Sequence, residues 1–247
     1  MRFLIKFSYD GTNYSGFQKQ RGLDTIEKRM EDALTIVNNG KKTTITATGR
    51  TDKGVHALSQ FLHADIDVKI TPNKLKRAMN TFLPDDIHVL STKIVSNDFN
   101  ARYNVLEKTY EYFIETGEYN PIQRNYIYQY NYDLDVEAMK EAIGVFVGEH
   151  DFRAFVTENK TKENCVREIT SAFVVSANGL IKIVFTGNGF MRYQVRNMVG
   201  ALLRIGQNKL TIDELVKILE SKDRTKACKT APAEGLYLVS VKYKDNI

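Results

Sequence analysis

The chain has 247 residues, of which 43% are hydrophobic, 11% aromatic and 26% charged, and its formal net charge is +5. This composition excludes an intrinsically disordered chain, and no apolar run approaches the roughly 18 residues that a membrane helix needs. The two cysteines, Cys165 and Cys228, lack the spacing of a zinc site or a disulfide framework. We therefore expect a cytoplasmic protein with no signal peptide and no metal centre.

Strand-like and helix-like segments alternate through the first half of the chain. Asp24 and Glu27 are spaced as a capping box before a helical stripe, and a second helix begins with Pro72 at its first position. The expected elements are a strand at 3–9, a helix at 26–37, strands at 43–49 and 59–68, a helix at 72–82 and a strand at 88–95.

A similar order of elements follows from about residue 105. Asn178-Gly179 is a strong hairpin signal between two apolar segments, and Thr211 and Glu214 form another capping box. The expected elements are a strand at 108–116, a loop at 117–132, a helix at 136–146, two strands within 171–187, helices at 191–206 and 212–219, and a strand at 235–243.

This repeated order predicts the fold class and the domain organisation. No linker rich in Gly, Pro or Ser separates the halves, which we place at residues 1–105 and 106–247. We expect an α+β protein of two ferredoxin-like (RRM-like) halves, whose antiparallel sheets join, with the helices on the outside. The active-site cleft is then expected between the halves.

Three segments interleave arginine and lysine with tyrosine or apolar residues, at 74–80, 101–112 and 191–204. Cations that contact phosphates beside rings that stack on bases are typical of RNA-binding proteins. Solvated helix faces would have the same composition, so both interpretations stand at this point.

Residues 47–57, ATGRTDKGVHA, place Asp52 between Arg50 and Lys53 in the connection between two strands. A polar turn with two glycines is the simplest interpretation. The connection is long for a turn, and apolar residues lie inside it, so we regard Asp52 as a candidate functional carboxylate.

Other candidate sites are few. The four histidines lack metal-ligand spacing, and no P-loop, GxSxG or GxGxxG motif is present. Asp85, Asp86 and Asp151 are the acidic candidates for a metal-dependent nuclease. The first two resemble a helix-to-strand turn, and Asp151 resembles a helix cap in a corner packed by Phe152 and Phe155.

The segment GRTDKGVHA resembles the catalytic segment of the TruA family of tRNA pseudouridine synthases. Further family-like segments occur in the family's order, so the resemblance spans nearly the whole chain. They are YDGTNYSGFQKQ (9–20), FNARYNVLEKTYEY (99–112), GEHDFRAF (148–155), MRYQVRNMVGALLRIG (191–206) and DRTKACKTAPAEGLYL (223–238).

The resemblance implies an isomerase that breaks the N1–C1′ bond of uridine, rotates the base and rejoins it through C5. Such a reaction needs no cofactor and no metal. Asp52 is implied as the catalytic carboxylate, either attacking C1′ or taking a proton from C2′ so that a glycal forms. Either route needs ionised Asp52, so a cation should lower its pKa, and Arg196 is the implied partner.

The resemblance also implies three residues that handle the RNA. Tyr110 stacks on the flipped uracil and Leu236 forms an apolar wall, while Arg50 helps to extrude the base. Tyr110 has a plain structural alternative as a strand tyrosine with its ring in the core, and Leu236 has one as a sheet residue. The implied partner of Asp52, Arg196, has the alternative of a surface arginine.

Family members act on the tRNA anticodon stem-loop, at tRNA positions 38 to 40, as homodimers, and we expect both properties here. The loop at 117–132 and the basic helix at 74–80 are candidates to contact tRNA or the second subunit. A non-catalytic RNA-binding or RNA-folding protein is the rival interpretation.

The sequence departs from the family pattern at several positions, which suggests a divergent paralogue. They are Asn100, Gln194, Cys228 and the Ile26-Glu27 pair. None is Asp52 or Tyr110, so the chemistry should be intact. The departures bear on which RNA is the substrate, and ribosomal RNA is the alternative to tRNA.

Overall fold

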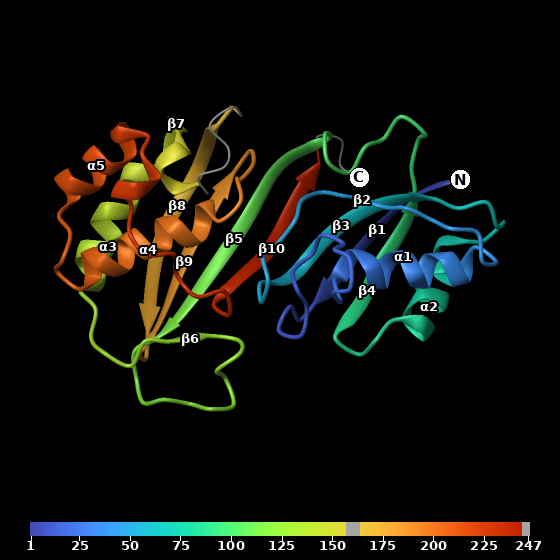
Figure 1. Ribbon diagram of the computed structural model, residues 1–247, viewed down its shortest axis with the longest axis horizontal. Helices are drawn as coiled ribbons and strands as arrows, with labels where there is room; N and C mark the ends of the chain where they lie inside the picture. The colour runs from blue at the N-terminus through green and yellow to red at the C-terminus, as the bar shows by residue number, and fades with distance from the viewer. Residues whose placement is uncertain (157–163, 244–247) are drawn as a thin grey trace. The chain divides into compact units, whose positions relative to one another are not determined.

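The computed structural model describes residues 1–156 and 164–243 (Figure 1). The chain divides into two compact units. Unit 1 comprises Met1–Leu106 and Leu238–Ile247, and unit 2 comprises Glu107–Tyr237. Each unit combines helices with a largely antiparallel sheet, which confirms the α+β class. Within the described ranges, no helix is both long enough and apolar enough to cross a membrane.

The sheet of unit 1 has the strand order β4-β1-β3-β10, and β2 pairs with β3. Strand β1 lies between β3 and β4 and is antiparallel to both. Ile5 of β1 is opposite Leu62 of β3 and Thr92 of β4. The elements are β1 (Arg2–Tyr9), α1 (Ile26–Val37), β2 (Thr46–Ala47), β3 (His56–Asp65), α2 (Pro72–Phe82), β4 (Ile87–Ile94) and β10 (Leu236–Tyr243), of which β10 begins with the last two residues of unit 2.

The sheet of unit 2 has the order β5-β9-β8-β7, with the short strand β6 parallel to β5. The strands are β5 (Val105–Glu115), β6 (Tyr128–Gln129), β7 (Gly148–Asp151), β8 (Val166–Ala177) and β9 (Leu180–Gly187). The helices are α3 (Val136–Ala142), α4 (Gln194–Gly206) and α5 (Ile212–Ser221), with short 3-10 helices at Ile143–Phe146, Phe152–Phe155 and Arg224–Lys226.

Several local predictions are confirmed. Pro72 occupies the first turn of α2, and the capping box of Thr211 and Glu214 opens α5. Asn178 and Gly179 both have positive φ, 51° and 83°, as the tight turn between β8 and β9 requires. These signals act over a few residues, so the sequence alone was enough to find them.

The predicted cap of α1 was wrong by one residue. Thr25, not Asp24, is the N-cap, and its hydroxyl accepts from the amide of Lys28 at 3.4 Å. Asp24 instead forms an ion pair with Arg29 at 2.6 Å. Glu27 is therefore not part of a capping box, and its carboxylate accepts a hydrogen bond from outside the helix.

Three predicted elements are shorter than expected, and one lies in the other unit. The strand expected at 43–49 is reduced to Thr46–Ala47, which pair with His63 and Leu62 of β3. The helix expected at 136–146 is α-helical only to Ala142 and continues as the 3-10 helix Ile143–Phe146. Helix α4 begins at Gln194 because Tyr193, with φ of 63°, has a left-handed conformation. The last strand was assigned to the second half, whereas Leu238 onward belongs to unit 1, where β10 lies beside β3.

In unit 1, α1 and α2 lie along the sheet (Figure 1), and their buried side chains share the core with β1. The fully buried members are Phe3, Ile5, Phe7, Met30, Leu34, Leu75 and Met79. Each such side chain contributes about 1.5–3 kcal/mol through burial.

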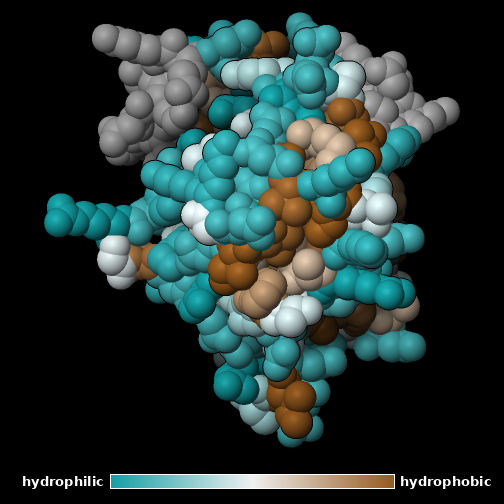
Figure 2. Space-filling model, turned by 90° about the vertical axis from the view of Figure 1, so that its right-hand side faces the viewer, coloured by the Kyte–Doolittle hydropathy of each residue, from teal (hydrophilic) through white to brown (hydrophobic). Residues whose placement is uncertain are grey.

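Figure 2 shows a band of hydrophobic side chains among hydrophilic ones on one face of the molecule. Exposed apolar residues of unit 1 include Ile36 of α1, Phe82 of α2 and Ile94 of β4. Apolar atoms make up more than half of a typical protein surface, so the band by itself identifies no partner.

Candidate active-site residues

Asp52 lies in the connection between β2 and β3, which we call the Asp52 loop (residues 48–55). Asp52 is half-buried, whereas Arg50 is exposed. The loop begins at buried Thr48, whose amide and hydroxyl both donate to the carbonyl of Phe61, at 2.9 and 3.0 Å. It ends where the amide of Val55 donates to the carbonyl of Asp52 at 3.2 Å. The loop therefore has fixed ends and a local turn around the carboxylate.

The segment after β1 packs directly against this loop. The hydroxyls of Tyr9 and Thr51 lie 2.8 Å apart in a buried contact, and burial raises the pKa of Tyr9. The amide of Phe17 donates to the carbonyl of Thr51 at 3.1 Å. Gly16 has φ of +92°, and a β-carbon there would lie 3.2 Å from the Lys53 amide nitrogen. Only glycine fits this contact without strain.

The turn at Asp10-Gly11 supports the other end of the loop. A β-carbon at Gly11 would lie 2.0 Å from the carbonyl oxygen of Val55, so a larger residue cannot occupy this position. The amide of Gly11 donates to Nδ1 of His56 at 3.1 Å, and a carboxylate oxygen of Asp10 lies 3.1 Å from the same nitrogen. The two contacts need different protonation states of Nδ1. The Gly11 amide can donate only to an unprotonated Nδ1 with a free lone pair, whereas the ion pair with Asp10 needs a protonated Nδ1.

Tyr110 lies in β5 with 9% of its surface exposed. Its ring meets that of Phe190 edge to face, with centroids 5.1 Å apart. Tyr112, two residues on and on the same face of β5, is fully buried, and its hydroxyl donates to the carbonyl of Pro232 at 2.9 Å. Burial, with the nearby Glu234 carboxylate, raises the pKa of Tyr112. The predicted alignment of Tyr110, Tyr112 and Ile114 on one buried face is confirmed.

Arg196 lies in the first turn of α4 and is partly buried. Its Nε donates to the carbonyl of Ala231 at 2.8 Å, and its guanidinium carbon lies 5.3 Å from the centre of the Tyr193 ring. The amide of Ala231 donates back to the Arg196 carbonyl at 3.0 Å. Ala231 thus holds the side chain of Arg196 and fixes its direction.

Leu236 is the first residue of β10, five residues after Ala231, and is 5% exposed. Its amide donates to the carbonyl of Ala233 at 2.9 Å, and Gly235 accepts from the amide of Phe113 in β5 at 2.9 Å. Within unit 2, these contacts join Arg196 to Ala231, and Gly235 to strand β5, which carries Tyr110. Unit 1 carries Asp52 and Arg50 on one loop. The roles of all five residues stay predictions.

The residues that support the Asp52 loop were not predicted. Gly11, Gly16 and His56 stand inside segments that resemble the family, but nothing in their spacing shows contact with the loop. The two glycines that precede the loop by more than thirty residues are the only signal, since glycines in an otherwise apolar or aromatic segment suggest close backbone approach.

Two of the alternative acidic residues, Asp86 and Asp151, make structural contacts. Asp86 accepts a hydrogen bond from the hydroxyl of Tyr14. Asp151 caps the 3-10 helix Phe152–Phe155 by accepting from the Arg153 amide at 3.1 Å, which confirms the predicted cap, and both phenylalanines are fully buried. No group of three or more His, Cys, Asp or Glu side chains that could hold a metal ion occurs in residues 1–156 and 164–243.

Comparison with known proteins identifies the family. A family model described as tRNA pseudouridine synthase matches residues 5–104 and 142–244. The chain belongs to this family. The matched residues include Arg50, Asp52, Arg196 and Leu236, whereas Tyr110 lies between the two matched ranges.

Individual relatives cover the full length of the chain. Proteins named tRNA pseudouridine synthase A from Streptococcus pneumoniae (strain P1031) and Streptococcus thermophilus (strain CNRZ 1066) are each 41% identical over 247 residues, which is 99% of this chain and 99% and 100% of those proteins. The protein of that name from Streptococcus equi subsp. equi (strain 4047) is 42% identical, with 99% of each chain covered.

One solved structure resembles the chain weakly. A chain of the "Crystal Structure of a Cbf5-Nop10-Gar1 Complex" has a TM-score of 0.35 and 11% sequence identity, covering 97% of this chain and 59% of that chain. A likeness at this level carries no argument about the tRNA pseudouridine synthase family.

Proposed function

We propose that this chain isomerises uridine to pseudouridine in tRNA. Full-length membership of the tRNA pseudouridine synthase family carries this proposal, because relatives of that name match the chain from end to end. The close packing around the Asp52 loop supports it, since a surface turn without function would not need glycines at Gly11 and Gly16.

Asp52 acts on the ribose in the proposed reaction. It either attacks C1′ or removes a proton from C2′, and in both cases the N1–C1′ bond breaks. The freed uracil rotates, C5 forms the new bond to C1′, and the hydrogen on C5 leaves as a proton while N1 ends protonated. Substrate and product are isomers, so the balance requires no oxidant, reductant or cofactor.

The other predicted residues handle the base and its charge. Tyr110 stacks on the uracil while it turns, and Leu236 limits its movement from the other side. Arg196 stabilises the ionised form of Asp52. Arg50 contacts the RNA and helps extrude the nucleotide, which costs a few kcal/mol when the target lies in a helix. The support for these roles is the family resemblance at each position.

Three finer properties belong to the same proposal. The sheets of the two halves join and the cleft lies between the halves, the enzyme acts as a cytoplasmic homodimer, and the target lies in the anticodon stem-loop at tRNA positions 38 to 40. The repeated order of elements supports the joined sheets and the cleft, and cysteine usage supports the cytoplasmic location. Family resemblance supports the homodimer and the tRNA positions, and the long loop at 117–132 and helix α2 offer surfaces for tRNA or the second subunit.

Mapping of the product on RNA tests the proposal. Unmodified tRNA and ribosomal RNA transcripts are incubated with the protein, treated with a carbodiimide that retains an adduct on pseudouridine, and read by reverse transcription. Stops at positions 38 to 40 of tRNA are expected. Stops only in ribosomal RNA would mean that ribosomal RNA, and not tRNA, is the substrate. Binding of tRNA without any stop would favour the interpretation as a non-catalytic RNA-binding protein.

A further inference from the structure

A short segment of unit 1 lies between helix α1 and the Asp52 loop. We call residues 16–19 the strap. On the loop side, the strap amide at Phe17 donates to the carbonyl of Thr51 at 3.1 Å. A β-carbon at Gly16 would lie 3.4 Å from the carbonyl carbon of Asp52, so the strap backbone is in contact with the candidate catalytic residue itself. A movement of the strap toward the loop would therefore meet the backbone of Asp52.

Helix α1 holds the strap from the other side. The amides of Ile26 and Glu27 donate to the strap carbonyls of Gly16 and Phe17, at 3.3 and 2.9 Å. These are first-turn amides, which have no partner inside their own helix. The carboxylate of Glu27 then accepts from the amide of Lys19 at 2.6 Å. A continuous series of hydrogen bonds thus runs from the start of α1 through the strap to Thr51.

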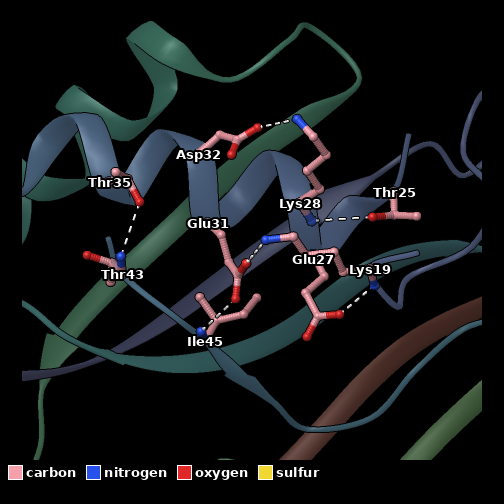
Figure 3. Close-up of polar contacts among 9 residues, drawn as sticks. All are labelled: Lys19, Thr25, Glu27, Lys28, Glu31, Asp32, Thr35, Thr43 and Ile45. Carbon is pink, nitrogen blue, oxygen red and sulfur yellow. Dashed lines mark hydrogen bonds and ion pairs between the residues drawn. The ribbon is translucent and has the colours of Figure 1, made fainter. Parts of the chain in front are cut away.

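Glu31 joins the strap to the entry of the Asp52 loop (Figure 3). One carboxylate oxygen lies 2.7 Å from Nζ of Lys19, at the end of the strap. The other accepts from the amide of Ile45 at 3.4 Å, directly before β2, the strand that leads into the loop. Glu31 is only 8% exposed, and burial of a carboxylate is costly unless it is paired and hydrogen-bonded.

We propose that Glu31 is a positioning residue for Asp52. It holds Lys19 at the end of the strap and Ile45 directly before β2, so the strap and β2 keep a constant distance from α1. Catalytic geometry is sensitive to displacement, and a shift of about 1 Å can cost roughly 10²-fold in rate. This inference rests on the proposed function for its kinetic consequence, although the positioning of the loop can be measured without substrate.

The same helix offers a matched control. Asp32, next to Glu31, forms an ion pair with Lys28 at 2.5 Å (Figure 3). Both side chains of this pair are about half exposed, at 52% and 43%, and the backbone amide of Lys28 donates to the hydroxyl of Thr25. Exposed pairs of this kind contribute little to stability, so Asp32→Asn removes one charge from α1 but keeps the hydrogen bond and ion pair between Glu31 and Lys19.

The experiment compares Glu31→Gln with Asp32→Asn in the full-length protein. Glutamine keeps the size of the side chain and an acceptor for Ile45, but it removes the charge that holds Lys19. We expect kcat to fall about tenfold in Glu31→Gln while KM for tRNA changes less than about twofold, because an interaction that acts only on the transition state changes kcat. Asp32→Asn should match the wild type in both constants.

Hydrogen exchange provides the second readout. The amides of residues 46–56 should exchange faster in Glu31→Gln than in the wild type. In Asp32→Asn they should exchange at the wild-type rate. Both variants are measured well below their melting temperatures. Lys19→Met should give the same kcat and exchange as Glu31→Gln, and the double variant should be no worse than either single one, since the two residues form one contact.

Unchanged kcat together with unchanged exchange in Glu31→Gln would overturn the inference. A rise in KM with kcat retained would also overturn it, because Glu31 would then act in binding. If the wild-type protein makes no pseudouridine, the proposed function fails, and the exchange of residues 46–56 still decides for or against the positioning role of Glu31.

Discussion

Gly16 packs against the backbone of Asp52, although the two residues are 36 positions apart. A β-carbon at Gly16 would come within 3.4 Å of the carbonyl carbon of Asp52 and 3.2 Å of the carbonyl oxygen of Thr51. The residue also has φ of +92°, which side chains rarely adopt. The position of the candidate catalytic residue therefore depends on a glycine far away in the sequence.

Gly16→Ala should lower both stability and turnover. The new methyl group meets backbone atoms and the backbone is strained at positive φ, so a loss of about 1–3 kcal/mol in the free energy of unfolding is expected. Denaturant unfolding and steady-state kinetics measure the two effects. Gly22→Ala is the control, because Gly22 also has positive φ (+75°) but nothing within 4 Å of its β-carbon position. Equal turnover in the two variants would show that contact with the Asp52 loop is unimportant.

Tyr110→Phe should retain more activity than Tyr110→Ala. A phenyl ring keeps the edge-to-face contact with Phe190 and the stacking on uracil, which is worth roughly 1–3 kcal/mol per base. Single-turnover rates at saturating tRNA compare the variants, with Tyr112→Phe as a control that loses only the hydrogen bond to Pro232. Equal losses in Tyr110→Phe and Tyr110→Ala would assign the role to the hydroxyl.

The affinity for tRNA should depend steeply on salt. A protein of net charge +5 that contacts several phosphates releases counterions on binding, and six contacts would reduce affinity by about 10³-fold between 50 and 200 mM salt. Filter binding over this range gives the slope. Replacement of exposed Lys74 and Arg77 in α2 by glutamine should reduce the slope if this helix contacts phosphate. A flat dependence would argue against a basic RNA-binding surface.

His63 should make stability depend on pH in the mildly acidic range. Burial, aided by the charge of Arg2, lowers the pKa of His63 below its usual 6.5, and Nδ1 accepts from the Ala101 amide at 3.0 Å. The His63 ring thus binds a proton more tightly in the unfolded chain than in the folded one. The stability that neutral His63 contributes is therefore complete above about pH 6.5 and is lost as pH falls below it. The melting temperature should decrease between pH 7 and pH 5, and the decrease should be smaller in His63→Gln.

His88→Gln serves as the control for that experiment, because His88 is exposed on β4. It should leave the pH dependence of the melting temperature as it is in the wild type. The same dependence in His63→Gln and the wild type would mean that another group is responsible.

The sequence predicted those features of the fold that depend on neighbouring residues. Pro72, the Thr211–Glu214 box and the Asn178-Gly179 turn all act within a few positions, and each was found correctly. The cap of α1 was missed because Asp24 and Thr25 are both good caps, and the Asp24 carboxylate forms an ion pair with Arg29 of the same helix instead.

The support of the candidate site could not be predicted from one sequence. Asp52 was found because its segment resembles a known family, but the contacts of Gly16 and Glu31 with its surroundings join residues that are distant in the chain. Glu31 lies in a helical pattern as one more charged residue, and only its burial and its two partners set it apart. Such contacts depend on how α1 packs, which periodicity does not specify.

The central claim is that Asp52 carries out the isomerisation, and tritium release tests it most directly. tRNA labelled at C5 of uridine is incubated with wild-type protein or with Asp52→Ala, and tritium in water is counted. The wild type should release tritium, and the variant should release none while its tRNA affinity stays within about tenfold, or ~1.4 kcal/mol, of the wild type. Release by Asp52→Ala at the wild-type rate would contradict the account.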